Sequence, residues 1–338
     1  MKKIKLIFIL LLISLIPITF MGCKKSNKIT ICEVAHSVFY APMYASIELG
    51  FFEEVGIDVE VVNGNGADKV MAALLSGDAQ IGLMGPEASV YVYIEGQEDY
   101  AVNFAQLTRT DGSFIIGRNP DDSFNLNKLK GKSILGGRLG GMPEMTLEYV
   151  LKKSGLLVGR DDDSVLNNGG VLVRTDVQFA AMAGAFAQGE GDYTTLFEPT
   201  ATQIVNEGKG YVLASVGSFA GDVPYTAFSS LKSYIEENEE TIELFTKAIY
   251  KGLLWVQSHK SEEIANVILP HFPSNTVKDL TTVTNRHKEI NAWVQTPLFT
   301  ENAYNNLIKI MEEAGELNGI APYKDIVTTK FAEKILNE

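Results

Sequence analysis

The chain has 338 residues, and its 42 acidic residues against 29 basic ones give a net charge of −13 at pH 7. An acidic body of this kind has no electrostatic footprint for nucleic acid, which excludes the nucleic-acid-binding classes. The length is too great for one small core and favours two lobes, and the two cysteines, Cys23 and Cys32, are too few for a cysteine zinc site.

The first residues have the pattern of an export signal. Three lysines within the first five residues precede an apolar run over 6–20, which ends at Gly22 and Cys23. A charged start, an apolar stretch and a small residue before a cysteine resemble a bacterial lipoprotein signal. We expect a signal peptide over 1–22, lipidation of Cys23, and a tether over 23–28 that holds the body on the extracytoplasmic face of the cell membrane. An uncleaved anchor helix is the alternative, and it gives the same location.

The stretch over 30–52 predicts a strand, a loop and a helix. Pro42 lies in the first turn of the helical pattern, where its missing N–H costs least, and Gly50 ends the pattern. Phe39 and Tyr40 stand at the helix start, where unpaired N–H groups beside aromatic rings make a socket for a small ligand. An ordinary strand–helix unit whose aromatic rings belong to the core is the alternative.

The same alternation continues after this unit. It predicts strands over 57–62, 80–84 and 101–107 and helices over 67–75 and 87–94. Repeated strand–loop–helix units favour an α/β fold with a largely parallel sheet, in which ligands collect beyond the carboxyl ends of the strands. Those ends fall at 36–40, 63–66, 85–87 and 108–111.

Two crossings are predicted to join the lobes. The polar stretch 119–127, after a further strand, is interpreted as the first crossing and 221–228 as the return. This interpretation assigns 29–117 and 226–338 to lobe 1 and 118–225 to lobe 2. The helical tail of the chain is expected to cover lobe 1. Strands are predicted over 114–117, 133–135, 171–174, 193–196 and 211–216, and helices over 144–154 and 178–188.

A glycine-rich loop over 136–143 is the richest local motif. Its four glycines let the backbone approach a ligand closely, and Pro143 starts a helix whose free N–H groups can hold an anion or a carbonyl. The loop lacks the Gly-Lys-Ser/Thr of a Walker loop and the spacing of a dinucleotide fingerprint. A flexible turn at the edge of the lobe is the alternative.

Glu198 is the acidic residue that the pattern places at a helix start. The segment 192–199 leads from a strand to Glu198 and Pro199, where a carboxylate can accept hydrogen bonds from ligand N–H groups. Stabilisation of the helix N-terminus alone is the alternative. The four histidines are far apart and have no partners at metal-ligand spacing, and Ser37 lies in no nucleophile elbow. We therefore expect no catalytic residues, no metal and no cofactor.

Several of these motifs together resemble a known family. HSVFYAPMYASIELGFFEEVGIDVEVV, the GDAQIGL step, the glycine loop and GDYTTLFEP are similar to the solute-binding proteins of ABC importers. The most similar branch binds nitrate, alkyl sulfonates and thiamine-pyrimidine precursors. The resemblance runs from about residue 28 to the C-terminal helices. It implies a type II periplasmic-binding-protein fold, in which ligand is trapped in a cleft between two α/β lobes.

The resemblance also suggests site residues and partners. It implies Phe39, Tyr40, Gly85, Gly140 and Glu198 at the cleft, a small-molecule ligand, and an ABC permease with its ATPase as partners of a monomer. Taken with the strand ends, the loops and the crossings, the full set of candidate ligand-binding residues is His36, Phe39, Tyr40, Asn63, Gly85, Pro86, Thr108, Arg138, Gly140, Gly141, Met142, Tyr193, Glu198 and Tyr225.

The ligand is inferred from the chemistry of these candidates. Aromatic rings with one carboxylate fit a flat, nitrogen-rich molecule, and we expect a thiamine-pyrimidine precursor or another heteroaromatic compound. An alkyl sulfonate or nitrate-type anion is the alternative, for which Arg109 and Arg138 are possible partners. A lipoprotein that senses ligand without transport is a second alternative. Enzymes of the family carry a cysteine-rich iron-binding motif, which this chain lacks, so an enzyme is not expected.

Overall fold

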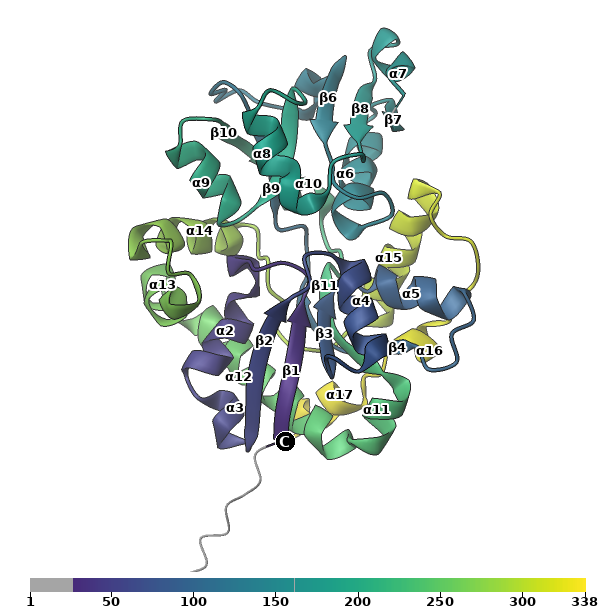
Figure 1. The fold of residues 1–338 in the computed structure, drawn as a ribbon, viewed down its shortest axis with the longest axis vertical. Helices are drawn as coiled ribbons and strands as arrows, with labels where there is room; N and C mark the ends of the chain where they lie inside the picture. Colours follow the sequence, from purple (N-terminus) through teal and green to yellow (C-terminus); the bar gives the residue numbers. More distant parts are fainter. Residues whose placement is uncertain (1–26, 161) are drawn as a thin grey trace, which may run out of the picture.

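Two sheets lie one above the other in the molecule, and helices cover both (Figure 1). The structure is a computed structural model that describes residues 27–160 and 162–338. The predicted α/β class is confirmed. The predicted signal peptide and Cys23 lie outside the described residues. Among those that are described, no helix is long and apolar enough to cross a membrane.

The sheet of lobe 1 consists of β1 (Asn27–Glu33), β2 (Ile57–Asn63), β3 (Ile81–Met84), β4 (Ala101–Thr108) and β11 (Thr226–Leu231). Its order is β2-β1-β3-β11-β4; β11 is antiparallel to both of its neighbours, and the other pairs are parallel. The helices between these strands are η2 (Val38–Tyr40), α2 (Ala41–Glu48), α3 (Phe51–Glu54), α4 (Ala67–Ser76) and α5 (Glu87–Ile94).

The sheet of lobe 2 consists of β5 (Ser113–Gly117), β6 (Lys132–Leu135), β7 (Val158–Arg160), β8 (Val171–Arg174), β9 (Tyr193–Phe197) and β10 (Tyr211–Ser215). Its order is β10-β5-β9-β6-β8-β7, with β5 antiparallel to β9 and β10. The helices of this lobe are η3 (Leu126–Leu129), α6 (Met142–Lys153), α7 (Ser164–Asn167), η4 (Phe179–Ala181), α8 (Met182–Ala187), α9 (Thr200–Asn206) and α10 (Gly217–Ala220).

The first crossing between the lobes lies earlier in the chain than the sequence predicts. The pattern over 114–117 correctly predicts a strand, but β5 pairs with β9 and β10 in the second sheet, with Phe114 opposite Leu196. The chain therefore crosses at 109–112, and the polar stretch 119–127 belongs to lobe 2. Hydrophobic periodicity identifies a strand but not its partners, which are distant in sequence.

The C-terminal helices cover lobe 1, as predicted, and some of them also contact lobe 2. α12 (Glu239–Ser258) packs against α2, α3 and β4, whereas α15 (Glu301–Ala314) packs against α6. The predicted apolar face of α12 is fully buried and consists of Ile242, Phe245, Ile249, Leu253 and Val256. The other helices of the tail are α11 (Lys232–Glu237), α13 (Ser261–Ile268), η5 (Leu269–His271), α14 (Val277–Glu289), α16 (Tyr323–Ile326) and α17 (Lys330–Leu336).

α12 approaches α2 so closely at Gly252 that no larger residue fits there. A Cβ on Gly252 would lie 2.1 Å from Ser46 Oγ and 2.3 Å from the carbonyl oxygen of Pro42. The Ser46 hydroxyl itself lies 2.8 Å from the Pro42 carbonyl and 3.0 Å from the Ala248 carbonyl, so it bridges the two helices. This contact fixes the helix that carries Tyr40 at its start.

Gly252→Ala tests this packing. Although alanine is the better helix former, we expect the substitution to destabilise the protein by about 1–3 kcal/mol, because backbone atoms cannot move aside cheaply. Gly184→Ala is the matched control. Gly184 lies in a helix, and a Cβ there would meet no atom within 4 Å, so a gain of about 0.5–1 kcal/mol is expected. Thermal unfolding of both variants measures the difference. Equal melting temperatures would contradict the described packing.

Candidate functional site

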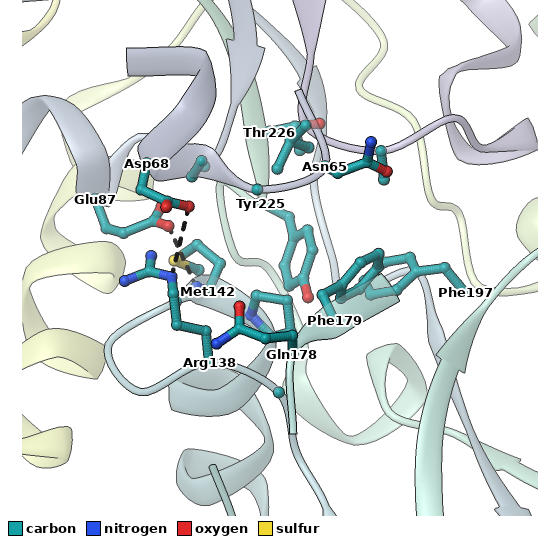
Figure 2. A pocket seen from close by; sticks show the side chains of 18 of the residues that line it. Asn65, Asp68, Glu87, Arg138, Met142, Gln178, Phe179, Phe197, Tyr225 and Thr226 are labelled. Atoms are coloured by element: carbon teal, nitrogen blue, oxygen red, sulfur yellow. Dashed lines mark hydrogen bonds and ion pairs between the residues drawn. The ribbon is translucent and has the colours of Figure 1, made fainter. Parts of the chain in front are cut away.

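A cavity of about 710 Å³, counted to its open mouth, lies between the two lobes (Figure 2). Both lobes contribute to its walls. From lobe 1 and the return crossing come Val34, Ala35, Tyr40, Asn65, Gly66, Ala67, Asp68, Gly85, Glu87, Tyr225 and Thr226. From lobe 2 come Gly137, Arg138, Gly141, Met142, Pro143, Gln178, Phe179 and Phe197.

Four aromatic side chains give the cavity an apolar part. Phe179 and Phe197 lie with ring centroids 5.6 Å apart, and Phe197 lies 6.0 Å from Tyr225; Tyr40 is the fourth. Figure 2 shows Phe179, Phe197 and Tyr225 beside one another, away from the charged residues. The Tyr225 hydroxyl is buried and has no hydrogen-bond partner of good geometry among the described residues. Together these rings form an aromatic wall against which a flat ligand can stack.

Asp111 is a buried acidic residue close to the Tyr225 hydroxyl. Burial raises the pKa of Asp111 to about 6, although hydrogen bonding from Ser113 lowers it. Its Oδ1 accepts a hydrogen bond from the backbone N–H of Ser113 at 2.6 Å. Burial and the nearby Asp111 carboxyl group both raise the pKa of Tyr225, so its hydroxyl stays protonated.

Glu87 is the most deeply buried charged group of the cavity. It begins α5, is 1% exposed, and its Oε1 accepts a hydrogen bond from the backbone N–H of Met142 in the other lobe at 3.3 Å. Its Oε2 has no partner among the described residues. Burial raises the pKa of Glu87 to about 7, while Arg138 and nearby backbone N–H groups lower it. The carboxyl group is therefore only partly ionised at neutral pH.

Arg138 and Asp68 complete the charged part of the cavity. Arg138 comes from the glycine loop of lobe 2 and Asp68 from the first turn of α4, and their nearest charged atoms are 3.9 Å apart. Both side chains are partly exposed, so solvent screens the pair and it contributes little stability. The pair joins the two lobes across the cavity (Figure 2).

The lobes also touch outside the cavity. Arg286 of α14 forms an ion pair with Glu198, which is buried at the end of β9. On another side of the molecule, the Arg160 guanidinium contacts Glu316 at 2.8 Å. The Tyr91 hydroxyl donates a hydrogen bond to the Gly140 carbonyl at 2.9 Å. The structure is therefore an arrangement in which the lobes are held together.

Six of the fourteen candidate residues line the cavity. They come from four separate segments, which the fold brings together although they are up to 185 positions apart in sequence numbering. They are Tyr40, Gly85, Arg138, Gly141, Met142 and Tyr225.

His36 and Asn63 lie at a neighbouring hollow, which shares Ala35, Phe179 and Phe197 with the cavity. The His36 ring is held by the Glu33 carboxylate at 2.8 Å and stacks on Phe272 with a centroid distance of 4.7 Å. The hydrogen bond to Glu33 raises the pKa of His36. His36 therefore already has partners for its ring within lobe 1.

Five further candidates are also absent from the cavity walls. Phe39 is fully buried, and the Thr108 side chain bonds Thr226 at 2.6 Å. Gly140 lies just outside, and Pro86 is likewise absent from the cavity walls. Tyr193 is at the start of β9 and packs on Phe124, whereas Phe197, at the end of that strand, lines the cavity. The sequence located the strand but favoured its wrong end.

Glu198 requires a correction. The sequence predicts a carboxylate free to meet ligand, but the structure provides both oxygens with protein partners. Oε1 pairs with Arg286, and Oε2 accepts the backbone N–H of Thr202 at 2.9 Å. The side chain is absent from the walls of the cavity. Its position at the helix start therefore stabilises the helix N-terminus, and its charge pairs with a residue 88 positions away.

The acids that do line the cavity were not singled out by sequence reasoning. Asp68 and Glu87 occupy the first turns of α4 and α5, which follow predicted strand ends. Their positions beyond these strand ends could therefore have identified them as candidates. Asn65, Gln178 and Phe179 were also missed. In the described part of the chain, no group of His, Cys, Asp or Glu is arranged to hold a metal ion.

The chain is similar in sequence to known proteins. The model of the NMT1-like family matches residues 26–269. YtlA of Bacillus subtilis (strain 168), a protein provisionally named as a binding protein, is 41% identical over 320 residues, which cover 94% of this chain and 93% of YtlA.

Solved structures share the fold at low sequence identity. The ligand-binding component of an ABC-type import system from Staphylococcus aureus, with zinc bound, has a TM-score of 0.70 and 14% identity, with 91% of this chain and 99% of that chain covered. The alkanesulfonate-binding protein SsuA from Xanthomonas axonopodis pv. citri, bound to MOPS, has a TM-score of 0.66 and 14% identity, with 90% and 98% covered. These matches confirm the predicted periplasmic-binding-protein fold.

Glu198→Gln tests the structural role of the ion pair with Arg286. We expect a loss of about 1–3 kcal/mol of stability, because Arg286 loses its buried partner. Arg286→Gln should cost a similar amount, and the double variant no more than about either single one, since the two residues act as a pair. Denaturant unfolding of the three variants measures this. Strictly additive losses would show that the residues act independently, and Glu207→Gln, at an exposed surface pair, is the control.

Glu87→Gln tests the raised pKa of Glu87. A carboxyl group whose pKa rises from 4.5 to about 7 on folding stabilises the folded state most below about pH 4.5, and this stability is lost as the pH rises to about 7. The variant lacks this titrating group, so its free energy of unfolding should not show this loss. Between about pH 4.5 and pH 7, the free energy of unfolding of the variant should therefore rise relative to that of the native protein by on the order of 2–3 kcal/mol. Above about pH 7 the difference between the two proteins should stay constant. Melting curves from about pH 4.5 to 8 measure this, with the exposed Glu98→Gln as control. Parallel curves throughout would refute the raised pKa.

Proposed function

The chain belongs to the NMT1-like family, and from this premise we propose that it is the ligand-capturing component of an ABC-type importer. It would bind a small molecule between its lobes and deliver it to a membrane permease that is driven by an ATPase. YtlA and the two solved neighbours are described as binding proteins, and the chain is a binding protein in the same sense, with no catalytic role.

One observation carries this proposal: the cavity is walled by side chains from both lobes. Tyr40 and Glu87 come from lobe 1, and Arg138 and Phe197 from lobe 2. A ligand that contacts both walls binds the closed arrangement better than an open one and shifts the equilibrium toward closure. A permease can then distinguish the closed, ligand-bound protein from the open, empty one by its shape.

The ligand we propose is a flat heteroaromatic molecule, such as a thiamine-pyrimidine precursor. The support comes from the aromatic rings of Tyr40, Phe179, Phe197 and Tyr225 in a cavity that also carries carboxyl groups. Rings offer stacking to a planar ligand, and a few polar groups then fix its orientation.

An anionic ligand, such as an alkyl sulfonate, is the second candidate. It is favoured by Arg138 and by the position of the α6 N-terminus, at Met142, in the cavity wall. Against it, the Met142 N–H already donates to Glu87, and two carboxyl groups face the same space. A sulfonate would therefore meet more negative than positive charge.

The location and the partners extend this proposal. From the lipoprotein-like pattern before residue 24 we infer attachment to the extracytoplasmic face of the membrane through lipid on Cys23. From the resemblance to solute-binding proteins we infer a monomer as the working form. A lipoprotein that senses ligand and signals without transport would need the same cavity. The genes next to its own would separate these roles, since transport requires a permease and an ATPase.

Native mass spectrometry of the freshly purified protein tests the proposal. We expect an additional small mass on the folded protein, which is released upon unfolding and is identified by fragmentation. Refolded, ligand-free protein should regain that mass, and small-angle scattering should then show a smaller radius of gyration than the empty protein. A protein that carries no small molecule and that no extract component compacts would contradict ligand capture.

A further inference from the structure

We propose that Glu87 selects the ligand of this cavity, and that it selects a nitrogen group that is positively charged or donates N–H bonds, such as an amidine or an aminoheterocycle. The inference rests on the proposed function, because it requires a small molecule between the lobes. It goes further by naming the residue and the chemical group that it recognises. Glu198, whose oxygens are both occupied, is replaced in this role.

The hydrogen bonds of Glu87 are incomplete in the structure. The side chain is 1% exposed, Oε1 accepts from Met142, and Oε2 is buried without a partner among the described residues. A buried carboxylate oxygen without a donor is costly, and a ligand N–H placed against Oε2 removes this cost. A ligand with an N–H donor at this position therefore binds more tightly than a ligand with an acceptor there.

Gly85 keeps Oε2 next to the cavity. A Cβ on this residue would lie 2.0 Å from Glu87 Oε2 and 2.7 Å from Met142 Cγ, so any larger residue would push the carboxyl group away. Gly85 itself lines the cavity. The absence of a side chain at Gly85 therefore leaves Oε2 directly behind the cavity wall, next to the ligand space, with no side chain between them.

The charges around Glu87 favour a cation over an anion. Asp68 and Glu87 oppose a single Arg138, whose guanidinium lies 3.9 Å from Asp68. The other ionisable groups that face Glu87 are the hydroxyls of Tyr40, Tyr91 and Tyr225, whose pKa values are all raised by burial and which are therefore neutral. A nitrogen cation balances the excess negative charge, whereas a sulfonate adds to it.

The cavity also separates charge from aromatic surface. Figure 2 shows Glu87, Asp68 and Arg138 at one end and Phe179 and Phe197 at the other, with Tyr225 between them. A planar ring that lies against the aromatic side chains would direct a substituent toward Glu87. The geometry thus fits an aromatic ligand with an amino or amidine group at one end.

Glu87 further couples recognition to closure. Oε1 accepts its hydrogen bond from Met142 at the start of α6, in the opposite lobe. The ionised carboxylate accepts this bond and a ligand N–H more strongly than the protonated acid, because charge-assisted hydrogen bonds are roughly twice as strong as neutral ones. A nitrogen cation that keeps Glu87 ionised therefore strengthens the contact between the lobes.

Binding of four simple probes tests the inference: benzamidine and 4-aminopyrimidine as donors, and benzoate and benzenesulfonate as anions. Calorimetry is performed on refolded, ligand-free protein at about pH 8, above the pKa of about 7 of Glu87. We expect benzamidine to bind at least about tenfold more tightly than either anion, and Glu87→Gln to weaken benzamidine by about tenfold or more. Glu98→Gln, an exposed glutamate of the same lobe, should bind benzamidine like the native protein.

A second variant covers the case in which Glu87→Gln does not fold. Arg138→Gln removes the opposing positive charge from the partly exposed loop, and it should strengthen benzamidine and weaken the anions. Tighter binding of benzenesulfonate, unchanged benzamidine affinity in Glu87→Gln, or no binding of either donor overturns the inference. If only the anions bind and compact the protein, ligand capture stands and the selection by Glu87 falls. If no probe binds and no small molecule co-purifies, both fall.

Discussion

The direction of the strands determines where every wall of the cavity comes from. In both sheets the parallel strands end at the surface between the lobes, so the loops and helix starts that follow them converge there. Val34 follows β1, Asp68 opens the helix after β2, and Glu87 opens the helix after β3. β11 runs the other way, so its beginning, at Thr226, lies at the same edge. A single geometric constraint thus assembles the cavity from segments that are far apart in the chain.

That constraint explains what the sequence could predict. Strand ends and helix starts are local patterns. Tyr40, Gly85, Arg138 and Met142, which line the cavity, were chosen as candidates because they occupy such positions. The acidic residues of the cavity were harder to predict, because an acidic residue at a helix start stabilises the helix whether or not it contacts a ligand. Position alone could not separate Glu87, with one oxygen free of partners among the described residues, from a purely structural glutamate.

The remaining errors share one physical cause, which is partners that are distant in sequence. Glu198 follows its strand as predicted, but Arg286 occupies its carboxylate from a helix 88 positions further along. β5 was predicted as a strand, but it pairs with β9 and β10 and so belongs to the second sheet. Tyr193 was predicted at the site, although only the far end of β9 reaches the cavity. Local periodicity carries no information on these pairings.

The ion pair between Glu198 and Arg286 has a consequence for how selectivity can change. If the lobes separate to admit ligand, this pair and the contact of Arg160 with Glu316 form again at each closure, whatever molecule lies inside. They add the same free energy to every guest that permits closure, and so they raise affinity without discriminating. Discrimination is then left to the few side chains of the cavity. A descendant of this protein could exchange one ligand for another by substitutions at those few residues. The contacts between the lobes, and the affinity that they contribute, would stay unchanged.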